Sequence, residues 1–408
     1  MISAHHTTSR RAARSGVPSV PLTLALAFTL AFLALAGSLA APQRAQATVG
    51  KGMIDWRLEM PEGISDLSTV PALVSEMGPA GLKANWTRIY FRWARLQPRQ
   101  PSATDPGYDD AYIAELDAVI GELHAQGIRV ILTGTDVPAW AADPKYRKGA
   151  NYSTDVVPKM GAKVVYTAWR GLATFLAARY ADKAGKTFAL ADHFEVWNEP
   201  NLGSGLYPQL VGKKKTVVGP KAYYLMLKYF YLGAKQGNRS AVVIAGATSR
   251  RGSNTASGTS PQWFAGYLKR MHATRYFNAY SHHPYTVPGS KPSPSAPPPQ
   301  PKRMVTLGNI STLLKIFPKT PFYLTEYGYS TGAQDLFCLT VSPANQAKYL
   351  RQAYALAATH KQIKALFWFV EKDFYAPTAE LPKGGIYSGL IGLDGKHKPA
   401  WDAFAGLP

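Results

Sequence analysis

Short strand-like runs alternate with longer helical patterns from residue 48 to the end of the chain, and this alternation constrains the fold more than any other feature. Such alternation is typical of βαβ units around a parallel sheet. Eight runs qualify as strands: Gly52–Arg57, Trp86–Arg92, Arg129–Thr133, His193–Asn198, Ala241–Gly246, Phe277–Ser281, Phe322–Glu326 and Ala365–Val370. Eight parallel strands with intervening helices close into a barrel. The sequence therefore predicts an α/β protein built as a single (β/α)8 barrel over residues 48–408.

Some of the connecting segments can also be interpreted. Apolar residues recur at three- and four-residue intervals from 113 to 123, so a helix there presents one apolar face to the barrel. Ser342 followed by Pro343 is typical of a helix start, and we expect that helix to run to about Ala357. The stretch from 288 to 301 is rich in proline and serine, which predicts an extended loop within the barrel domain.

The first 47 residues have the three-part layout of a secretory signal. Three arginines, at positions 10, 11 and 14, precede an apolar run from Leu22 to Leu35, and small residues follow up to Ala47. Such a segment is removed on export, so we expect cleavage after Ala47 and a secreted domain with no stable membrane insertion. The alternative is a retained membrane anchor, although the run is shorter than the roughly 20 residues that a bilayer-spanning helix needs.

Composition limits the class of protein and its partners. The chain is 46% hydrophobic, which suffices for a large core and excludes a disordered or fibrous protein. Cys338 is the only cysteine, so no disulfide can form within the chain. The net charge is +21, and residues 1–47 carry four positive charges and no acid, which leaves +17 on the rest. This charge favours anionic partners or, as the alternative, only aids solubility.

Two glutamates stand at the ends of predicted strands. The fourth strand leads to Glu199, and Pro200 then stops it, while the seventh leads to Glu326. Active sites of (β/α)8 barrels lie at the carboxyl ends of the strands, so we expect the two carboxylates to converge on one mouth. Cleavage of a glycosidic bond requires two carboxyl groups, one to protonate the leaving oxygen and one to act at the anomeric carbon or on water.

The fourth strand ends in EVWNEPN over residues 195–201, and together with the glutamate at the end of the seventh strand it resembles the clan A glycoside hydrolases. Within that clan the chain looks closest to family 39, with family 5 next. The closing segment GLDGKHKPA, residues 392–400, is also similar to the clan, so the resemblance covers nearly the whole chain after residue 48. It implies a retaining hydrolase with Glu199 as general acid/base and Glu326 as nucleophile.

The resemblance also implies roles for residues near the two glutamates. It places Arg88 of the second strand beside the nucleophile, with a structural salt bridge as the alternative. Asn198 would bond the 2-hydroxyl of the sugar, an interaction that strengthens in the transition state. His283 and Tyr285 would lie at the mouth after the sixth strand, with Tyr285 donating to the nucleophile. Asn278 departs from the pattern, because relatives often have aspartate there.

Aromatic residues are expected to bind sugar rings, whose apolar faces pack well on an indole. We expect Trp368 of the eighth strand to form this floor, with a core tryptophan as the alternative. Trp140 and Trp93 follow strand ends and could extend the platform, although core or rim packing fits them equally well. Glu371 is expected to be a solvated loop acid, and Glu195 an internal ion-pair partner.

The loops after the third to sixth strands are strongly basic. Apart from Glu199 their acids are Asp136, Asp143 and Asp155. Their basic residues are Lys145, Arg147, Lys148, Lys159, Lys163, Lys213, Lys214, Lys215, Lys221, Arg250, Arg251, Lys291, Lys302 and Arg303. Because such a field attracts anions, we hypothesise an anionic glycan as substrate.

Two other functions are weighed against hydrolysis. A non-catalytic carbohydrate-binding barrel is the main alternative, but such a protein would have little reason to keep both glutamates, the arginine and the aromatic floor. A nucleic-acid partner is not expected, because no recognition motif interleaves the basic and aromatic residues. No metal or other cofactor is expected, since the adjacent histidines 282 and 283 lack a cysteine or carboxylate cluster in the sequence.

Overall fold

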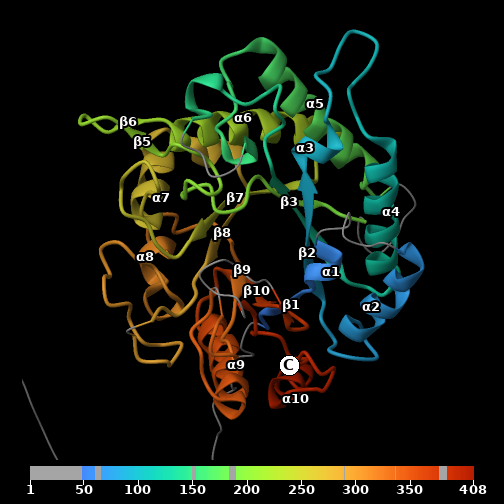
Figure 1. Ribbon diagram of the computed structural model, residues 1–408, viewed down its shortest axis with the longest axis vertical. Coiled ribbons are helices and arrows are strands. Elements are labelled where there is room, and N and C mark those ends of the chain that lie inside the picture. Colours follow the sequence, from blue (N-terminus) through green and yellow to red (C-terminus); the bar gives the residue numbers. More distant parts are fainter. Residues whose placement is uncertain are drawn as a thin grey trace, which may run out of the picture. The chain divides into compact units, whose positions relative to one another are not determined.

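The computed structural model describes residues 48–59, 66–148, 153–182, 190–288, 290–335, 337–375 and 384–408. Its centre is a closed barrel in which every pair of neighbouring strands is parallel (Figure 1). The strands follow the order β1-β10-β9-β8-β7-β4-β3-β2 around the barrel. They are β1 (Gly50–Ile54), β2 (Trp86–Arg92), β3 (Arg129–Thr135), β4 (His193–Glu195), β7 (Val242–Ser249), β8 (Ala279–His283), β9 (Phe322–Tyr327) and β10 (Ile363–Phe369). The predicted (β/α)8 barrel is confirmed.

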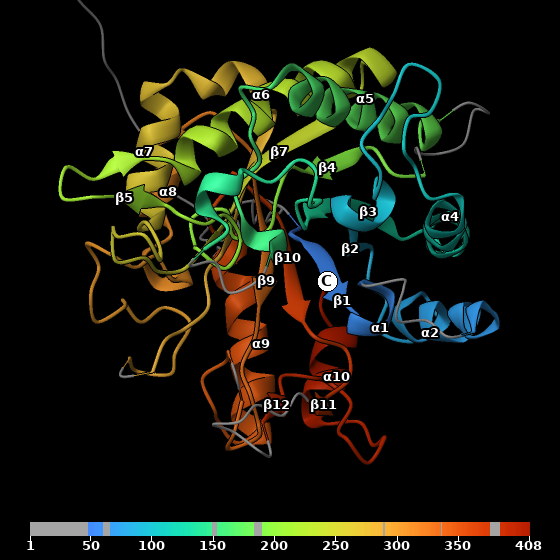
Figure 2. The same cartoon turned by 45° about the horizontal axis from the view of Figure 1, so that its top comes forward.

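Helices surround the barrel, as Figures 1 and 2 show from two directions. The α-helices are α1 (Trp56–Glu59), α2 (Val70–Met77), α3 (Trp93–Leu96), α4 (Asp110–Ala125), α5 (Lys163–Arg179), α6 (Gly219–Gly237), α7 (Pro261–Arg270), α8 (Ser311–Leu314), α9 (Pro343–Ala358) and α10 (Pro399–Ala405). Short 3-10 helices span Leu67–Thr69, Pro144–Tyr146, Ser153–Asp155, Ala273–Tyr276 and Leu307–Asn309. Within the described ranges, no helix combines the length and apolarity needed to cross a membrane.

Two helix predictions are confirmed in detail. The apolar residues between positions 113 and 123 lie in α4 and are buried. Ser342 caps α9, where its side chain accepts a hydrogen bond from the backbone N–H of Asn345, and Pro343 is the first helical residue. Serine is favoured at this position because its oxygen satisfies one of the free N–H groups of the first turn.

The first strand was predicted too far along the chain. We expected Gly52–Arg57, but β1 ends at Ile54 and Arg57 lies in α1. The cause is Asp55, whose carboxylate accepts from the backbone N–H of Arg57 at 2.9 Å and whose carbonyl accepts from Leu58 N–H at 3.0 Å. A short polar side chain that bonds the backbone two residues on favours a turn over a strand.

Small additions to the barrel were not predicted. One hairpin pairs β5 (Leu210–Val211) with β6 (Thr216–Val217) after the fourth barrel strand, and another pairs β11 (Phe374–Tyr375) with β12 (Gly385–Ile386). The Pro- and Ser-rich stretch 288–301 contains no helix or strand at its described positions, as predicted; residue 289 lies outside them. The proposed signal segment, residues 1–47, also lies outside the described residues.

Apolar side chains form two buried layers. Alternate strand residues point into the barrel, because successive side chains of a strand face opposite ways. The interior layer contains Ile54, Trp86, Ile131, Ile244, Ala279, Tyr323, Ala365, Phe367 and Val370. A larger layer packs the outer faces of the strands against the helices and includes Ile89, Leu132, Phe194 and Leu324. The polar residues described next lie at the carboxyl ends of these strands.

Candidate active site

The two predicted catalytic glutamates lie close together at the mouth of the barrel. Glu326 is in β9, and Glu199 lies four residues beyond the end of β4. Beyond β4 the chain keeps contact with its neighbours, since Asn198 N–H donates to the carbonyl of Gly134 and Glu199 N–H to that of Ala247. Glu199 has a left-handed φ of 41°, a conformation that non-glycine residues rarely adopt and that is common at functional sites.

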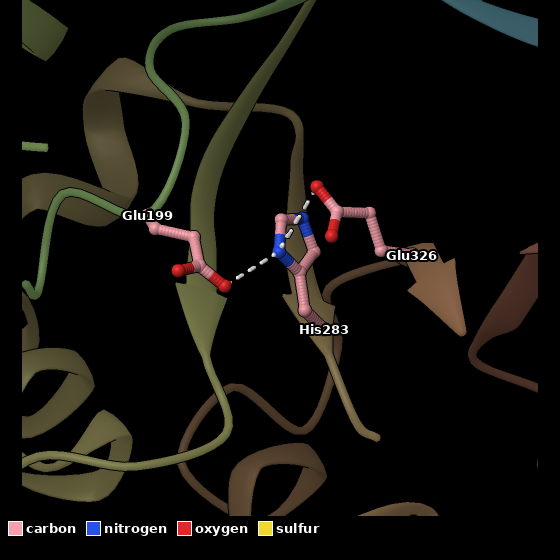
Figure 3. Close-up of side chains that lie close together, drawn as sticks. All are labelled: Glu199, His283 and Glu326. Carbon is pink, nitrogen blue, oxygen red and sulfur yellow. Dashed lines mark hydrogen bonds and ion pairs between the residues drawn. The ribbon is translucent and has the colours of Figure 1, made fainter. Parts of the chain in front are cut away.

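His283 stands between the two carboxylates (Figure 3). Its Nδ1 lies 3.1 Å from Glu199 Oε1 and 3.5 Å from Glu326 Oε1. One oxygen of each glutamate and a ring nitrogen of His283 all lie within 4.8 Å of one another. The side chain of Glu199 is 24% exposed and that of Glu326 is 11% exposed, so Glu199 is the more accessible carboxylate.

Glu326 is held as an anion by two donors. Arg88 Nη2 donates to Oε1 at 2.6 Å, and the hydroxyl of Tyr285 donates to Oε2 at 2.8 Å. Burial by itself would raise the pKa of Glu326, but His283, Arg88 and Tyr285 together outweigh burial and hold that pKa below its usual value. The carboxylate is therefore ionised and fixed in position, as a nucleophile must be.

Arg88 is fully buried and connects the site residues. Besides Glu326 it contacts Asn198 Oδ1 at 3.4 Å, His283 Nε2 at 3.3 Å and the hydroxyl of Tyr90 at 2.9 Å. A guanidinium can only donate, so Nε2 accepts in the neutral imidazole and Nδ1 carries the hydrogen that faces the glutamates. Arg88 thus also fixes the tautomer of His283.

The pKa of His283 reflects its two acidic neighbours. Burial lowers this pKa, but the charges of Glu326 and Glu199 more than offset burial and raise it above its usual value. The adjacent His282 is different, because burial lowers its pKa to about 3 and its nitrogens bond Thr248 and the carbonyl of Val305. His282 is therefore a structural residue.

Glu195 is an internal ion-pair partner, as expected. It is buried between the hydroxyls of Thr133 and Thr325, each 2.8 Å from a carboxylate oxygen. Its Oε2 lies 3.8 Å from Arg88 Nη1. Arg88 therefore contacts both the structural carboxylate of Glu195 and the carboxylate of Glu326.

Trp368 does not form the predicted aromatic floor. It is fully buried in the layer between strands and helices, and its Nε1 donates to the carbonyl of Ser388 at 2.8 Å. Phe367 faces the barrel interior, so strand alternation directs Trp368 outward, away from the mouth. The core alternative is the correct one.

Phe369 is the aromatic residue that β10 presents at the mouth, and it was missed. It is half-buried and packs on the interior layer, and its ring meets that of Tyr285 edge-on, with centroids 6.3 Å apart. The residue alternation of β10 carried this signal: Ala365 and Phe367 are interior residues, and Phe369 continues their series. Trp368 has the indole on which a sugar face packs well, but it lies on the other face of β10.

The other aromatic and acidic candidates lie elsewhere. Trp140 is half-buried; its Nε1 donates to the carbonyl of Gln97 at 3.0 Å and its ring packs edge-on against the buried Trp93. Both tryptophans therefore pack in the core or at its rim. Glu371 is buried rather than solvated, 3.5 Å from Arg57 Nη2, and burial and the nearby Asp55 raise its pKa well above the usual value.

A pocket of about 230 Å³ opens beside Asn198. Its walls include Tyr90, the Arg92–Asp136 ion pair and Ser204. Hydroxyl, amide and charged groups therefore converge next to the glutamates, as is typical of a site for a polar ligand. Six of the eight predicted site residues lie in one contact network, which touches this pocket through Asn198: Arg88, Asn198, Glu199, His283, Tyr285 and Glu326.

The cluster of Glu199, His283 and Glu326 has the composition of a cation site. However, Glu326 Oε1 already accepts from Arg88 at 2.6 Å, and the same guanidinium faces His283 Nε2. A metal ion would have to share both ligands with a buried positive charge, so this arrangement suits proton transfer better than metal binding.

No protein-family model and no curated protein matches the sequence. Three solved structures resemble the fold. A family 39 glycoside hydrolase from the gut symbiont Bacteroides cellulosilyticus has a TM-score of 0.59 at 17% identity, covering 89% of this chain and 64% of its own. A monomeric β-xylosidase from Caulobacter crescentus has a TM-score of 0.54 at 18% identity, with coverages of 88% and 67%. GH5_18 from Streptomyces cattleya, solved with GlcNAc, has a TM-score of 0.57 at 16% identity, with coverages of 88% and 79%.

The present chain thus spans just under two thirds of the family 39 structure. At these identities the likeness concerns the fold: the chain is a (β/α)8 barrel similar in architecture to glycoside hydrolases of families 39 and 5.

Proposed function

We propose that this protein is a secreted retaining glycoside hydrolase that uses Glu326 as nucleophile and Glu199 as general acid/base. The observation that carries the proposal is the spacing of the pair, with one oxygen of each carboxylate within 4.8 Å. Retaining enzymes hold their carboxyl groups about 5–5.5 Å apart, whereas inverting enzymes need about 6.5–9.5 Å to admit a water.

The proposed reaction has two displacements. First, an oxygen of Glu326 attacks the anomeric carbon, the bond from that carbon to the leaving oxygen breaks, and Glu199 protonates the leaving oxygen. Then Glu199 takes a proton from water, and the water oxygen attacks the anomeric carbon and releases Glu326. The net configuration is retained.

The neighbours support this division of roles. Arg88 and Tyr285 occupy both oxygens of Glu326 and favour its charged form. Glu199 is the more exposed of the two and has His283 as a partner, which suits a group that exchanges its proton twice in each cycle. Asn198 lies beside both Arg88 and the pocket, where a sugar 2-hydroxyl could reach it.

We further propose that Phe369 replaces Trp368 as the sugar platform, and that the substrate is an anionic glycan. The second idea is supported by the basic loops of the catalytic face and the net charge of +21. Export is proposed from the layout of residues 1–47 alone.

The test is hydrolysis of a panel of aryl β-glycosides and of neutral and acidic polysaccharides. Native protein is compared with Glu199→Ala, Glu326→Ala and the control Asp402→Asn, which removes an exposed acid on α10. We expect both alanine variants to lose activity and the control to keep it. Azide should rescue Glu326→Ala with an inverted glycosyl azide as product, and Glu199→Ala with a retained one.

Binding without turnover across the panel would refute the hydrolase and favour a carbohydrate-binding barrel. Equal turnover of neutral and acidic substrates, with no dependence on salt, would refute only the anionic substrate.

A further inference from the structure

A second pocket, of about 440 Å³, lies outside the cluster around the two glutamates. The loops that follow β4, β7 and β8 form its walls, and its lining includes Tyr207, Ser257, Arg251 and Arg303. None of the described residues that line it is acidic. Among the described residues, neither arginine makes an ion pair, and both side chains are exposed to solvent. Two exposed arginines that make no ion pair in the described part of the chain therefore line this pocket.

Backbone contacts fix the two arginines relative to each other. Arg251 and Met304 form an antiparallel bridge, and the N–H of Val305 donates to the carbonyl of Arg250 at 2.9 Å. Arg303 precedes Met304 directly, so this pairing brings the loop after β8 alongside the end of β7. Because these backbone contacts exist before any ligand binds, only the exposed side chains remain to be ordered on binding.

Further hydrogen bonds tie the same pocket to the loop that carries Glu199. The side-chain amide of Asn201, two residues after Glu199, donates to the carbonyl of Arg251 at 3.0 Å. The N–H of Gly203 donates to the carbonyl of Ser257 at 2.8 Å. One wall of the pocket is therefore the segment that follows the proposed acid/base.

The two pockets also adjoin each other. Ser204 lines both the pocket beside Asn198 and the pocket that contains the arginines. Glu199 would protonate the leaving oxygen, so the part of a glycan beyond that oxygen runs past the segment after Glu199. The arginine pocket adjoins that segment, so we assign it to the leaving-group side of the site.

Arg250 extends the positive charge toward the glutamates. It is half-buried, its guanidinium lies 5.6 Å from the ring centroid of Tyr285, and its Nη1 donates to the carbonyl of Phe337 at 3.3 Å. Burial lowers the pKa of Arg250, while nearby groups, Glu199 among them, act to raise it. Arg250 thus lies beside the cluster around the two glutamates, while its sequence neighbour Arg251 lines the arginine pocket.

We propose that the arginine pocket binds an acidic sugar unit on the leaving-group side of the substrate. This inference rests on the proposed glycosidase function and adds a subsite to it. Guanidinium groups bind carboxylate and sulfate groups through paired, charge-assisted hydrogen bonds. The serine hydroxyls and the ring of Tyr207 offer the hydrogen-bonding and apolar contacts that the rest of a sugar unit needs.

The test measures binding and hydrolysis separately. Calorimetry on the inactive Glu326→Gln protein compares four tetrasaccharides: cellotetraose, its sulfated form, β-1,4-linked glucuronate and α-1,4-linked galacturonate. Arg251→Gln and Arg303→Gln are added singly and together. Lys214→Gln is the matched control, since it removes the same charge from the exposed tip of the β5–β6 hairpin, outside the pocket.

We expect an acidic tetrasaccharide to bind more tightly than cellotetraose, and each arginine substitution to weaken that binding about tenfold or more. Lys214→Gln should change it less than threefold. Preference for a uronate or for the sulfated ligand identifies the anionic group. Equal binding of all four ligands, or equal losses in the arginine and lysine variants, would overturn the proposal.

Hydrolysis of a neutral aryl glycoside by the arginine variants in the active background separates the two claims. Such a substrate carries no acidic group for the arginines to bind, so its kcat/KM should stay within about twofold of native. Native activity without selective binding refutes the pocket alone, whereas selective binding without any activity refutes the hydrolase and leaves the pocket as an anion site.

Discussion

Tyr285→Phe is the sharpest test of how Glu326 is kept reactive. The change removes only the hydroxyl that donates to Glu326 Oε2 at 2.8 Å. The ring, which packs near Tyr327 and Phe369, stays in place. Any change in activity therefore reports on one hydrogen bond to the proposed nucleophile rather than on repacking.

The size of the effect follows from the charge of the acceptor. A hydrogen bond to a charged group contributes about 1.5–3 kcal/mol, and each 1.36 kcal/mol is tenfold in rate. If the bond is worth its full value in the reacting complex, kcat/KM falls by about 10- to 150-fold. Arg88 still contacts Oε1 at 2.6 Å, so the loss stays smaller than that of Glu326→Ala.

The pH profile gives a second, independent readout. Tyr285 is one of the groups that hold the pKa of Glu326 below its usual value. Without this donor the pKa of Glu326 rises, so its carboxylate becomes protonated at a higher pH as a solution is acidified. The acid limb of the kcat/KM profile, measured with the best aryl glycoside of the panel, should move to higher pH.

Tyr327→Phe is the matched control. Its hydroxyl is buried beside the same loop but bonds Tyr329 at 3.0 Å and approaches Thr286, not a glutamate. This variant should leave the acid limb in place. An unmoved acid limb in Tyr285→Phe, or an equal shift in Tyr327→Phe, would refute the reasoning.

Three further predictions address buried residues in and around the site. Arg88→Met should lower the free energy of unfolding by about 3–5 kcal/mol, because it leaves the buried carboxylates without their cation. Urea unfolding measures this free energy, and a loss under about 1 kcal/mol would contradict the prediction. Glu371 has a raised pKa in the folded state, so its folded form keeps a proton that unfolding releases, and stability falls as pH rises above about 4.5 toward that raised pKa. Melting temperatures of Glu371→Gln should therefore decline less between pH of about 5 and 8 than native ones, and parallel curves would contradict this. Trp368→Phe should reduce stability by about 1–3 kcal/mol without changing KM, whereas Phe369→Ala should raise KM; the reverse pattern would restore Trp368 as the platform.

The barrel could be predicted because its signal is repeated eight times along the chain. Strands at β2 and β9 were placed within one residue at each end, since both are apolar runs with clear boundaries. The predicted end of β1 was wrong because the side chain of Asp55 determines where that strand ends. A single local hydrogen bond of this kind does not alter the periodic pattern of apolar residues, so the pattern cannot predict it. The β5–β6 and β11–β12 hairpins were missed because two-residue strands are too short for any pattern.

The two glutamates could be predicted because each stands at a strand end, where the topology fixes its place. Trp368 could not be placed in the same way, because shifting a strand by one residue moves every side chain to the other face. The environment of Glu371 was wrongly predicted for another reason. It follows the end of β10 in the sequence, which suggests a solvated loop, yet its side chain is buried beside Arg57 of α1. That contact links the segments after β1 and after β10, which are far apart in the sequence. They meet only because β1 pairs with β10 when the barrel closes.

The position of His283 ties the two proposed steps of the reaction together. In the free protein the negative charge of Glu326 is one of the groups that raise the pKa of His283, and His283 in turn contacts Glu199. When Glu326 becomes an ester in the covalent intermediate, it no longer carries that charge. The pKa of His283 then falls. Formation of the ester thus lowers the proton affinity of the group that contacts Glu199 before the second displacement begins. The same short spacing that permits direct attack by Glu326 therefore also couples the charge of Glu326 to the partner of Glu199.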